Sequence, residues 1–192
     1  MTIQEVTKED AAELLEIYAP YVTDTAISFE YVVPTLEEFE ERIESIASRL
    51  PYLKAVEDGK IIGYAYAAPF KWRKAYDWSV ETTIYLRKEA RRNGTGRALY
   101  EKLEFLLREI GIMNMNACIA VPDEEGPRLT MDSIHFHTRM GFVPVGTFHY
   151  SGYKFDTWYD MLWMEKMLGE HKSPQADVRF GEWRNKLCHL SV

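Results

Sequence analysis

Cysteine is scarce in this chain of 192 residues, which holds only Cys118 and Cys188. Two cysteines do not make the framework of several disulfides that stabilises small secreted domains. Nothing near Cys118 in the sequence marks an activated thiolate, so we expect a buried, inert side chain there. The N-terminal segment is acidic and lacks the basic and apolar parts of a signal peptide. We therefore expect a cytoplasmic protein.

Long apolar runs and a surplus of positive charge are also missing. No apolar run approaches the ~18 residues that a membrane span needs, so no membrane partner is expected. The net charge of −7 argues against a nucleic-acid partner. His135 and His137 are two positions apart and face different sides of a helix, so we expect no metal site. The length suits one globular domain with a full core.

The stretch from Glu81 to Ile110 predicts a strand, a loop and a helix. Residues 82–86 are β-branched or aromatic, which is typical of a strand. From Leu99 onward, leucine and isoleucine recur at helical spacing. Residues 87–97 between them carry five basic side chains and one acidic side chain. Positive charge is thus concentrated where the predicted helix begins.

A helix that begins after a glycine-containing loop is suited to bind an anion. The first amides of the helix lack intrahelical acceptors, and the helix dipole adds positive charge at that end. Gly94 and Gly96 would let a phosphate approach those amides. The alternative is an ordinary turn that uses glycine for its geometry and arginine for solubility. The loop is neither a Walker motif, since no Gly-Lys-Ser/Thr follows, nor a dinucleotide fingerprint, since position 99 is Leu.

Several separated motifs resemble one enzyme family. RRNGTG, residues 91–96, resembles the Arg/Gln-x-x-Gly-x-Gly/Ala motif of the GNAT N-acetyltransferases, whose loop holds the pyrophosphate of acetyl-CoA. AAPFKWRKAYDWSVETTIYL (67–86), SIHFHTRMGFVPVG (133–146) and KFDTWYD (154–160) resemble the branch that acetylates phosphinothricin and methionine sulfoximine. The resemblance covers roughly residues 1–167.

The resemblance implies an α/β GNAT fold, with a mixed, largely antiparallel sheet flanked by helices. Its splayed central strands would bind acetyl-CoA, and the protein would be a homodimer. The domain would span residues 1–168, followed by a C-terminal extension, 169–192, of unknown role. Apolar spacing within 178–190 fits a helix that packs either on the domain or on a partner. The local patterns predict strands at 2–6, 52–57, 60–68, 82–86, 114–121, 142–150 and 155–166.

Turn and cap signals mark the remaining boundaries. Thr7 with Asp10 and Thr35 with Glu38 are typical of capping boxes at helix starts. Pro20 is expected to end or bend the first helix. Asp58-Gly59 predicts a hairpin turn.

Acetyl transfer to an amine needs a base for the ammonium proton and donors for the thioester oxygen. Glu81, at the head of the central strand among apolar residues, is our candidate base, and the resemblance assigns it that role, often through water. A strand-end glutamate that faces solvent is the alternative. The resemblance places His137 near the CoA sulfur, where it would protonate the thiolate. The alternative is a core histidine bonded to backbone.

The resemblance also implies the residues that bind the cosubstrate. Main-chain groups of Ile84, Tyr85 and Leu86 would hold the acetyl group and the pantetheine arm. The remaining positions lie in the phosphate loop and before the histidine helix: Arg91, Arg92, Asn93, Gly94, Thr95, Gly96, Arg97, Thr130 and Ser133. Thr130 departs from the family, which has asparagine there, and the loop 122–130 looks longer than usual.

Six residues are candidates for the acceptor site. The resemblance places loop 23–33 over the acceptor, and the basic, aromatic segment 69–78 would bind a carboxylate, because arginine holds carboxylates bidentately. Ordinary solvated loops are the alternative. The candidates are Phe29, Glu30, Lys71, Arg73, Tyr76 and Trp78.

The expected function is acetyl-CoA-dependent N-acetylation of the α-amine of a small amino-acid-like acceptor, by direct attack in a ternary complex. Phosphinothricin-specific enzymes have Lys-His where this chain has Lys154-Phe155, which favours the methionine sulfoximine or sulfone subgroup. Two alternatives remain open. One is acetylation of a peptide N-terminus or a polyamine. The other is a catalytically silent CoA-binding module whose tail contacts a partner.

Overall fold

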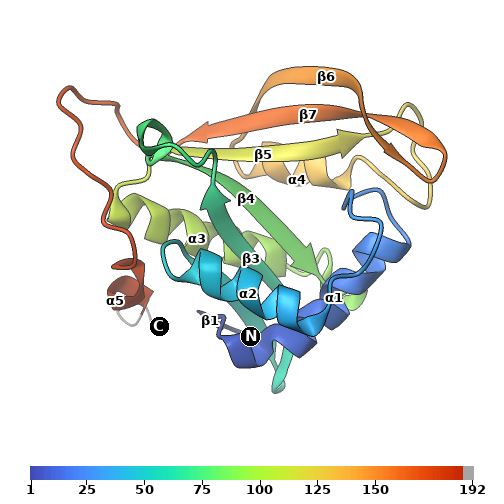
Figure 1. Cartoon of the computed structure of the whole chain (residues 1–192), viewed down its shortest axis with the longest axis horizontal. Coiled ribbons are helices and arrows are strands. Elements are labelled where there is room, and N and C mark those ends of the chain that lie inside the picture. The colour runs from blue at the N-terminus through green and yellow to red at the C-terminus, as the bar shows by residue number, and fades with distance from the viewer. Residues whose placement is uncertain (188–192) are drawn as a thin grey trace.

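The computed structural model describes residues 1–187, which form a seven-stranded mixed sheet in the order β1-β2-β3-β4-β5-β7-β6 (Figure 1). The strands are β1 (Thr2–Glu5), β2 (Tyr52–Glu57), β3 (Lys60–Pro69), β4 (Ser79–Leu86), β5 (Asn114–Val121), β6 (Val143–Lys154) and β7 (Thr157–Met167). The helices are α1 (Ala11–Thr23), α2 (Leu36–Ala47), α3 (Thr95–Ile110), α4 (Asp132–Arg139) and α5 (Trp183–Leu187). All neighbouring strands pair antiparallel except β4 and β5, which confirms the expected mixed, largely antiparallel sheet.

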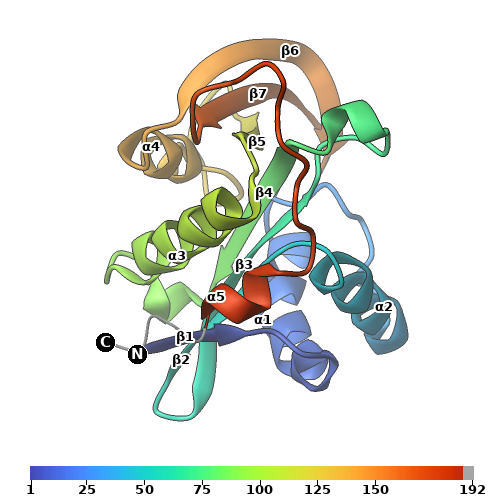
Figure 2. The same ribbon diagram turned by 90° about the vertical axis from the view of Figure 1, so that its left-hand side faces the viewer.

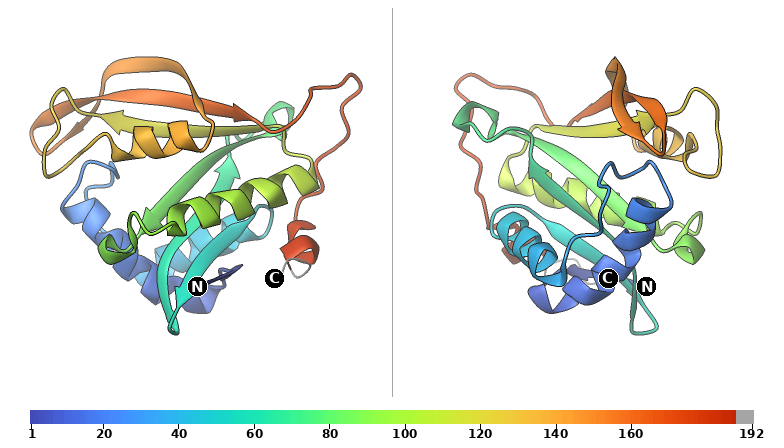
Figure 3. Two further views of the ribbon diagram at one scale, coloured as in Figure 1. Left: turned by 180° about the vertical axis from the view of Figure 1, so that it is seen from behind. Right: turned by 45° about the vertical axis from the view of Figure 1, so that its right-hand side comes forward.

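Helices cover both faces of the sheet. Helices α1 and α2 lie on one face, and α3 and α4 lie on the other, as the views from the front and from behind show (Figures 1 and 3). Each face has its own apolar cluster, one built around α3 and the other around α1 and α2. The buried leucines of α3, from Leu99 to Leu107, are the ones that the helical spacing predicted.

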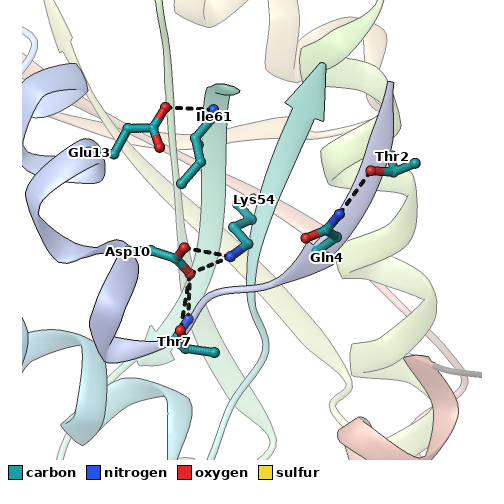
Figure 4. Close-up of polar contacts among 7 residues, drawn as sticks. All are labelled: Thr2, Gln4, Thr7, Asp10, Glu13, Lys54 and Ile61. Atoms are coloured by element: carbon teal, nitrogen blue, oxygen red, sulfur yellow. Dashed lines mark hydrogen bonds and ion pairs between the residues drawn. The ribbon is translucent and has the colours of Figure 1, made fainter. Parts of the chain in front are cut away.

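Polar contacts fix the start of α1 against the sheet (Figure 4). The Thr7 amide donates to the Asp10 carboxylate, which also accepts from Lys54 Nζ at 2.5 Å. One turn later, the Glu13 carboxylate accepts from the Ile61 amide. Both predicted capping boxes are present. Pro20 does not end the helix, which continues to Thr23. A proline lacks the N–H that would bond the carbonyl four residues earlier, and here this single missing bond lies in the last turns of the helix.

The two central strands separate part-way along their length. Strands β4 and β5 pair at only three positions, from Ser79 with Asn114 to Glu81 with Asn116. Each then continues beside its outer neighbour, β3 or β7, and the two diverge (Figure 1). The Thr82 hydroxyl donates to the Asn116 main-chain carbonyl, and the Asn116 side-chain amide donates to the Val80 carbonyl. Side chains therefore bond the two strands at the point where they diverge.

Strand β4 begins at Ser79, three residues before the predicted strand, so Glu81 is its third residue rather than a residue at its head. The last hairpin differs from prediction as well. Strand β6 extends to Lys154, and β7 begins at Thr157. Phe155 and Asp156, predicted to open the strand, form the turn instead, both with positive φ. Two central residues with positive φ make the tight turn that matches the twist of the flanking strands.

The C-terminal segment 169–187 returns across the end of the sheet and places α5 near β1 (Figure 2). Trp183 has no exposed surface and packs in the α3-side core. Arg184 Nε lies 2.5 Å from the Glu5 carboxylate, and its Nη2 donates to the Ala47 carbonyl. Of the two alternatives left by the sequence, the described part of this segment takes the first, packing on the domain. Residues 188–190 of the predicted helix, and Cys188, lie outside the described residues.

Within residues 1–187, no helix is both long enough and apolar enough to span a membrane. The same part of the chain holds no group of three or more His, Cys, Asp or Glu side chains placed to bind a metal ion.

Candidate active site

A cavity of about 250 Å³ occupies the gap between the diverging strands. Its walls come from β4, β5, the loop after α1, α3, α4 and β7. Residues of the α1 side, such as Phe29, and of the α3 side, such as Tyr100 and His137, line the same space. The cavity therefore brings together groups from both faces of the sheet.

Glu81 lies in this cavity at the last paired position of β4. Burial raises the pKa of its carboxyl, and the nearby Lys71 ammonium acts in the opposite direction. A carboxylate with a raised pKa is a better proton acceptor at neutral pH. On β5, Cys118 is half-buried in the same cavity. Burial, with a smaller contribution from the Glu81 carboxylate, raises the pKa of its thiol to about 12, so it stays protonated.

His137 is held on both ring nitrogens. Its Nδ1 lies 2.7 Å from the Ser133 carbonyl, and its Nε2 lies 3.0 Å from the Tyr100 hydroxyl. A carbonyl only accepts, so Nδ1 carries the proton, and Nε2 of the neutral ring offers a lone pair to the Tyr100 hydroxyl, whose one proton it shares with Thr82 Oγ1, 3.3 Å from that hydroxyl. Burial lowers the pKa of His137 to about 4, although the bond to Ser133 opposes the shift. The ring is therefore neutral at pH 7, an arrangement that fits the core-histidine alternative.

The strand alternation decides which main-chain groups of β4 face the gap. The Ser79 carbonyl and the Arg87 amide bond toward β3, whereas the Val80 carbonyl bonds toward β5. Ile84 and Leu86 are an even number of residues from Val80, so their main-chain N–H and C=O groups face the gap. Tyr85 is an odd number of residues from Val80, so its main-chain groups face β3. The Tyr21 hydroxyl already donates to the Leu86 carbonyl and accepts from the Leu86 amide. The role predicted for the main chains of Ile84, Tyr85 and Leu86 toward the cosubstrate stays a prediction.

The loop before α3 is exposed from residue 91 to 94, whereas Thr95 and Gly96, the first two residues of the helix, are buried. Gly94 has a φ of 95°, a conformation that glycine adopts at little cost, so its role includes turn geometry. The Asn93 carboxamide oxygen accepts from the Thr95 amide. The next two amides, those of Gly96 and Arg97, belong to the first turn of α3, whose amides have no acceptor within the helix. A Cβ on Gly96 would lie 3.2 Å from the Phe136 ring, so this glycine also allows α3 to pack on α4.

The basic residues of the loop have different environments. Arg91 lies over the Tyr21 ring, with its guanidinium carbon 5.2 Å from the ring centroid. Arg92 is highly exposed and pairs with Asp132 on α4 at 3.2 Å. Of two further predicted residues, Thr130 lies just before α4 and Ser133 is the second residue of that helix. The Thr130 hydroxyl is 3.4 Å from the Asp132 amide, and Ser133 lines the cavity.

The predicted acceptor residues fall into two groups. Phe29 lines the cavity, and its neighbour Glu30 pairs with Arg42 at 2.6 Å. One Glu30 carboxylate oxygen is buried and has no hydrogen-bond partner among the described residues. The second group is on the β3–β4 loop. Lys71, Arg73 and Tyr76 line a second cavity of about 300 Å³, and the Trp78 indole donates to the Ala176 carbonyl of the C-terminal segment.

The comparison with known families agrees with this architecture. Residues 3–163 match the family described as the acetyltransferase (GNAT) domain. The chain belongs to the GNAT acetyltransferase family. It is an N-acetyltransferase with the GNAT fold, as the sequence predicted, and acetyl-CoA is the cosubstrate of this family.

Individual relatives are similar over nearly the whole chain. A phosphinothricin N-acetyltransferase of Streptomyces viridochromogenes is 32% identical over 92% of both chains. An L-methionine sulfoximine/L-methionine sulfone acetyltransferase of Salmonella typhimurium is 29% identical over 92% of this chain and 99% of its own. A solved phosphinothricin acetyltransferase of Sinorhizobium meliloti, in complex with acetyl-CoA, has a TM-score of 0.83, with 31% identity and 93% coverage of each chain.

Sequence reasoning missed several residues that line this cavity or bond to its strands. Tyr100 was recognisable only as an apolar position of α3, and Thr82 and Asn116 as strand residues. Tyr21 lies 65 residues from the Leu86 groups that it binds. No local signal pairs these residues, because the contacts depend on how the elements pack. The sequence gives one hint. A tyrosine on the buried face of a helix, such as Tyr100, indicates that its hydroxyl has a hydrogen-bond partner in the core.

We predict that His137 makes the stability of the enzyme depend on pH. The pKa is about 4 in the folded protein, compared with ~6.5 in an unfolded chain. Below pH 6.5 the unfolded chain binds a proton that the folded chain does not, so the free energy of unfolding falls as the pH drops toward 4. Between pH 7 and 5 the loss due to this residue is ~2 kcal/mol.

Urea unfolding of the wild type and of His137→Gln at several pH values measures this contribution, which the variant should lack. NMR titration of the His137 ring gives a direct check. A titration midpoint near pH 7 would contradict the neutral, buried imidazole and favour a role for His137 as an acid.

Proposed function

We propose that this enzyme acetylates the α-amine of a small amino-acid-like acceptor, of the methionine sulfoximine, methionine sulfone or phosphinothricin type, with acetyl-CoA as donor. One observation carries the proposal: a half-buried carboxylate lies in a cavity that opens between β4 and β5 and is lined from both faces of the sheet. The printed names of the relatives support the acceptor class.

On the α3 side, the proposal assigns acetyl-CoA to the gap and the helix start. The pyrophosphate would lie against the amides of Gly96 and Arg97, with Arg91, Arg92 and Arg97 supplying positive charge. Arg92 would exchange its exposed pair with Asp132 for the phosphate. The pantetheine arm would follow β4 and bond to the Ile84 main chain. Thr130 and Ser133 lie at the facing end of α4.

On the α1 side, the amine would approach Glu81. The acceptor ammonium gives a proton to the Glu81 carboxylate, directly or through water, and its nitrogen lone pair attacks the thioester carbonyl carbon. The tetrahedral intermediate collapses, the C–S bond breaks, and the attacking nitrogen loses its second proton to water as the amide forms. CoA leaves as a thiolate, which is tolerable because an alkyl thiol has a pKa of ~8.5. The expectation that His137 gives the thiolate its proton stays a prediction.

The acceptor's carboxylate would bind near Lys71. This ammonium acts electrostatically on Glu81 and also lines the second cavity, so it connects the two spaces. Arg73 and Tyr76 would extend the subsite from that cavity. Trp78 would support the loop from behind through its bond to Ala176. Phe29 and Glu30 would form the opposite wall.

Two substitutions should separate base chemistry from cosubstrate binding. Glu81→Gln keeps the shape but cannot accept a proton, so we expect kcat/KM for the amine to fall ~10²–10⁴-fold with an unchanged Kd for acetyl-CoA. Arg97→Gln should weaken acetyl-CoA binding by about tenfold or more, because it removes a charged partner of the phosphates. Arg108→Gln, at the far end of α3 and paired with Glu104, is the matched control. Calorimetry and steady-state kinetics measure both quantities.

The deficit of Glu81→Gln should shrink as the pH rises, because more of the acceptor is then already a free amine. Full activity of Glu81→Gln at neutral pH would place the base elsewhere. A deficit that is equal at every pH would show that Glu81 positions the acceptor and transfers no proton.

We predict that methionine sulfoximine or methionine sulfone is acetylated with a higher kcat/KM than phosphinothricin, by about tenfold. The relevant residue is Phe155 in the β6–β7 turn, where the phosphinothricin enzymes have histidine. Its ring lies against the Arg128 guanidinium, 4.1 Å away. Phe155→His should move the preference toward phosphinothricin, whose phosphinate is anionic. Equal or reversed values for the wild type would remove this subgroup assignment.

We also propose that the enzyme is a homodimer that associates through β6. This edge strand exposes a row of apolar side chains, including Phe148, which is 63% exposed, and such patches mark interfaces. Phe148→Asp should convert the dimer to monomers in sedimentation velocity. Trp72→Asp, which changes a residue that is 79% exposed elsewhere, is the control and should remain dimeric. A wild-type monomer at micromolar concentration would contradict the proposal.

A cytoplasmic location is part of the same proposal, because acetyl-CoA is made and used inside cells. Fractionation of cells that express the chain tests it, and recovery of the enzyme outside the cytoplasmic fraction would contradict it.

A further inference from the structure

Lys154, the last residue of β6, is a buried cation with a complete set of acceptors. Only 2% of the residue is exposed. Its Nζ donates to the carbonyls of Val22 at 2.7 Å, Thr25 at 2.9 Å and Ser28 at 2.6 Å. An ammonium has three N–H donors, and here each has one carbonyl. Burial of a charge is unfavourable unless such bonds are made, so this ammonium selects one arrangement of the three carbonyls.

All three acceptors belong to one segment, residues 22–28, which leads from α1 into the cavity wall. Ile27, Ser28 and Phe29 line the cavity opposite the β4 and β5 residues. Helix α1 also contacts this wall, because the Ser28 hydroxyl is 2.7 Å from the Tyr18 hydroxyl on that helix. The segment therefore depends on contacts with two different elements.

Gly152, two residues before Lys154, leaves room for the Phe29 ring of this wall. The two residues share the buried face of β6, while Tyr153 between them is exposed. A Cβ on Gly152 would lie only 2.0 Å from the Phe29 ring, so the ring occupies the space that a side chain would take. Phe29 also packs against Tyr159 of β7. The end of the β6–β7 hairpin is thus shaped to receive this segment.

We infer that Lys154 is a positioning residue for the acceptor: its ammonium fixes segment 22–28 so that Ser28 and Phe29 form the cavity wall facing Glu81. The inference rests on the proposed function, since it concerns the acceptor side of that site. Lys154 itself does not touch the reacting atoms. Its removal should loosen the acceptor wall and leave the α3 side, where acetyl-CoA binds, unchanged.

Lys154→Met removes the three donors and keeps most of the side-chain volume. We expect kcat/KM for the acceptor to fall ~10–100-fold, mainly through KM, because small displacements of a positioning wall are costly. The Kd for acetyl-CoA should stay within about twofold. Lys166→Met is the matched control, since Lys166 is a partly buried β7 lysine that bonds Glu104 and the Met140 carbonyl. It should lose stability but keep the acceptor KM.

A double-mutant cycle tests whether Lys154 acts through the wall. If it does, Lys154→Met should add little to the loss caused by Phe29→Leu, whereas independent effects would add. Gly152→Ala displaces the Phe29 ring from the other side and should reproduce the rise in acceptor KM, even if Lys154→Met does not fold. An unchanged KM in both Lys154→Met and Gly152→Ala, or an equal rise in Lys166→Met, would overturn the inference.

Hydrogen exchange separates this inference from the proposed function. In Lys154→Met, the Ala26 amide, which donates to the Arg128 carbonyl, and the Glu30 amide, which donates to the Ser28 hydroxyl, should exchange faster. Amides of α3 should not change. This measurement needs no acceptor, so it holds even if the wild type acetylates none of the amines. Unchanged exchange in segment 22–31 would overturn the role of Lys154.

Discussion

The structure depends on one break in hydrogen bonding: the central strands β4 and β5 stop pairing after Glu81 and Asn116. Buried main-chain groups need partners, so a sheet that opens in its middle must satisfy them in another way. Side chains do part of this, because Thr82 and Asn116 bond the strands where they part and Tyr21 bonds both main-chain groups of Leu86. Ile84, between these points, turns its main chain toward the gap. The opening is therefore limited to the stretch where a bound cosubstrate would supply the missing partners.

The same opening determines the electrostatics of the site. The gap is lined by apolar and polar side chains together, and burial in it removes ionisable groups from bulk water, so they favour their neutral forms. Burial raises the pKa of Glu81 and lowers that of His137 to about 4. These shifts have opposite consequences for chemistry: the glutamate becomes a stronger base, whereas the histidine becomes a weaker base that stays neutral. Burial in the same cavity thus has different consequences for Glu81 and His137, the two candidate catalytic residues. In addition, both ring nitrogens of His137 are hydrogen-bonded, to the Ser133 carbonyl and to the Tyr100 hydroxyl.

Local signals in the sequence predicted most of the elements, and packing decided what they could not. Alternation and helical spacing located the strands and α3, and the capping boxes at Thr7 and Thr35 were correct because caps depend on residues three apart. The course of the C-terminal segment was open, since the apolar spacing of Phe180, Trp183 and Leu187 suits a helix on this domain or on a partner. The contacts of Leu86 and Lys154 were beyond reach, because their partners lie 65 or more residues away in the chain. The motif at 91–96 indicated the family correctly but not that Gly96 also packs on Phe136.

The β6–β7 hairpin joins two surfaces that the sequence presents as unrelated. Residues 143–150 of β6 carry exposed apolar side chains, and the end of the strand carries Gly152 and Lys154, which contact the wall formed by Ser28 and Phe29. The Tyr31 hydroxyl, beyond the wall, donates to the Tyr153 carbonyl on the same strand, so the acceptor loop contacts the hairpin at more than one point. Both groups belong to one continuous strand, so a partner bound to the exposed row would also restrain the backbone that carries Gly152 and Lys154. Dimerisation through β6, as proposed, would therefore stabilise the acceptor side of the cavity without contributing a residue to it. The proposed cosubstrate side would be built from α3, α4 and β4, and would not depend on that contact.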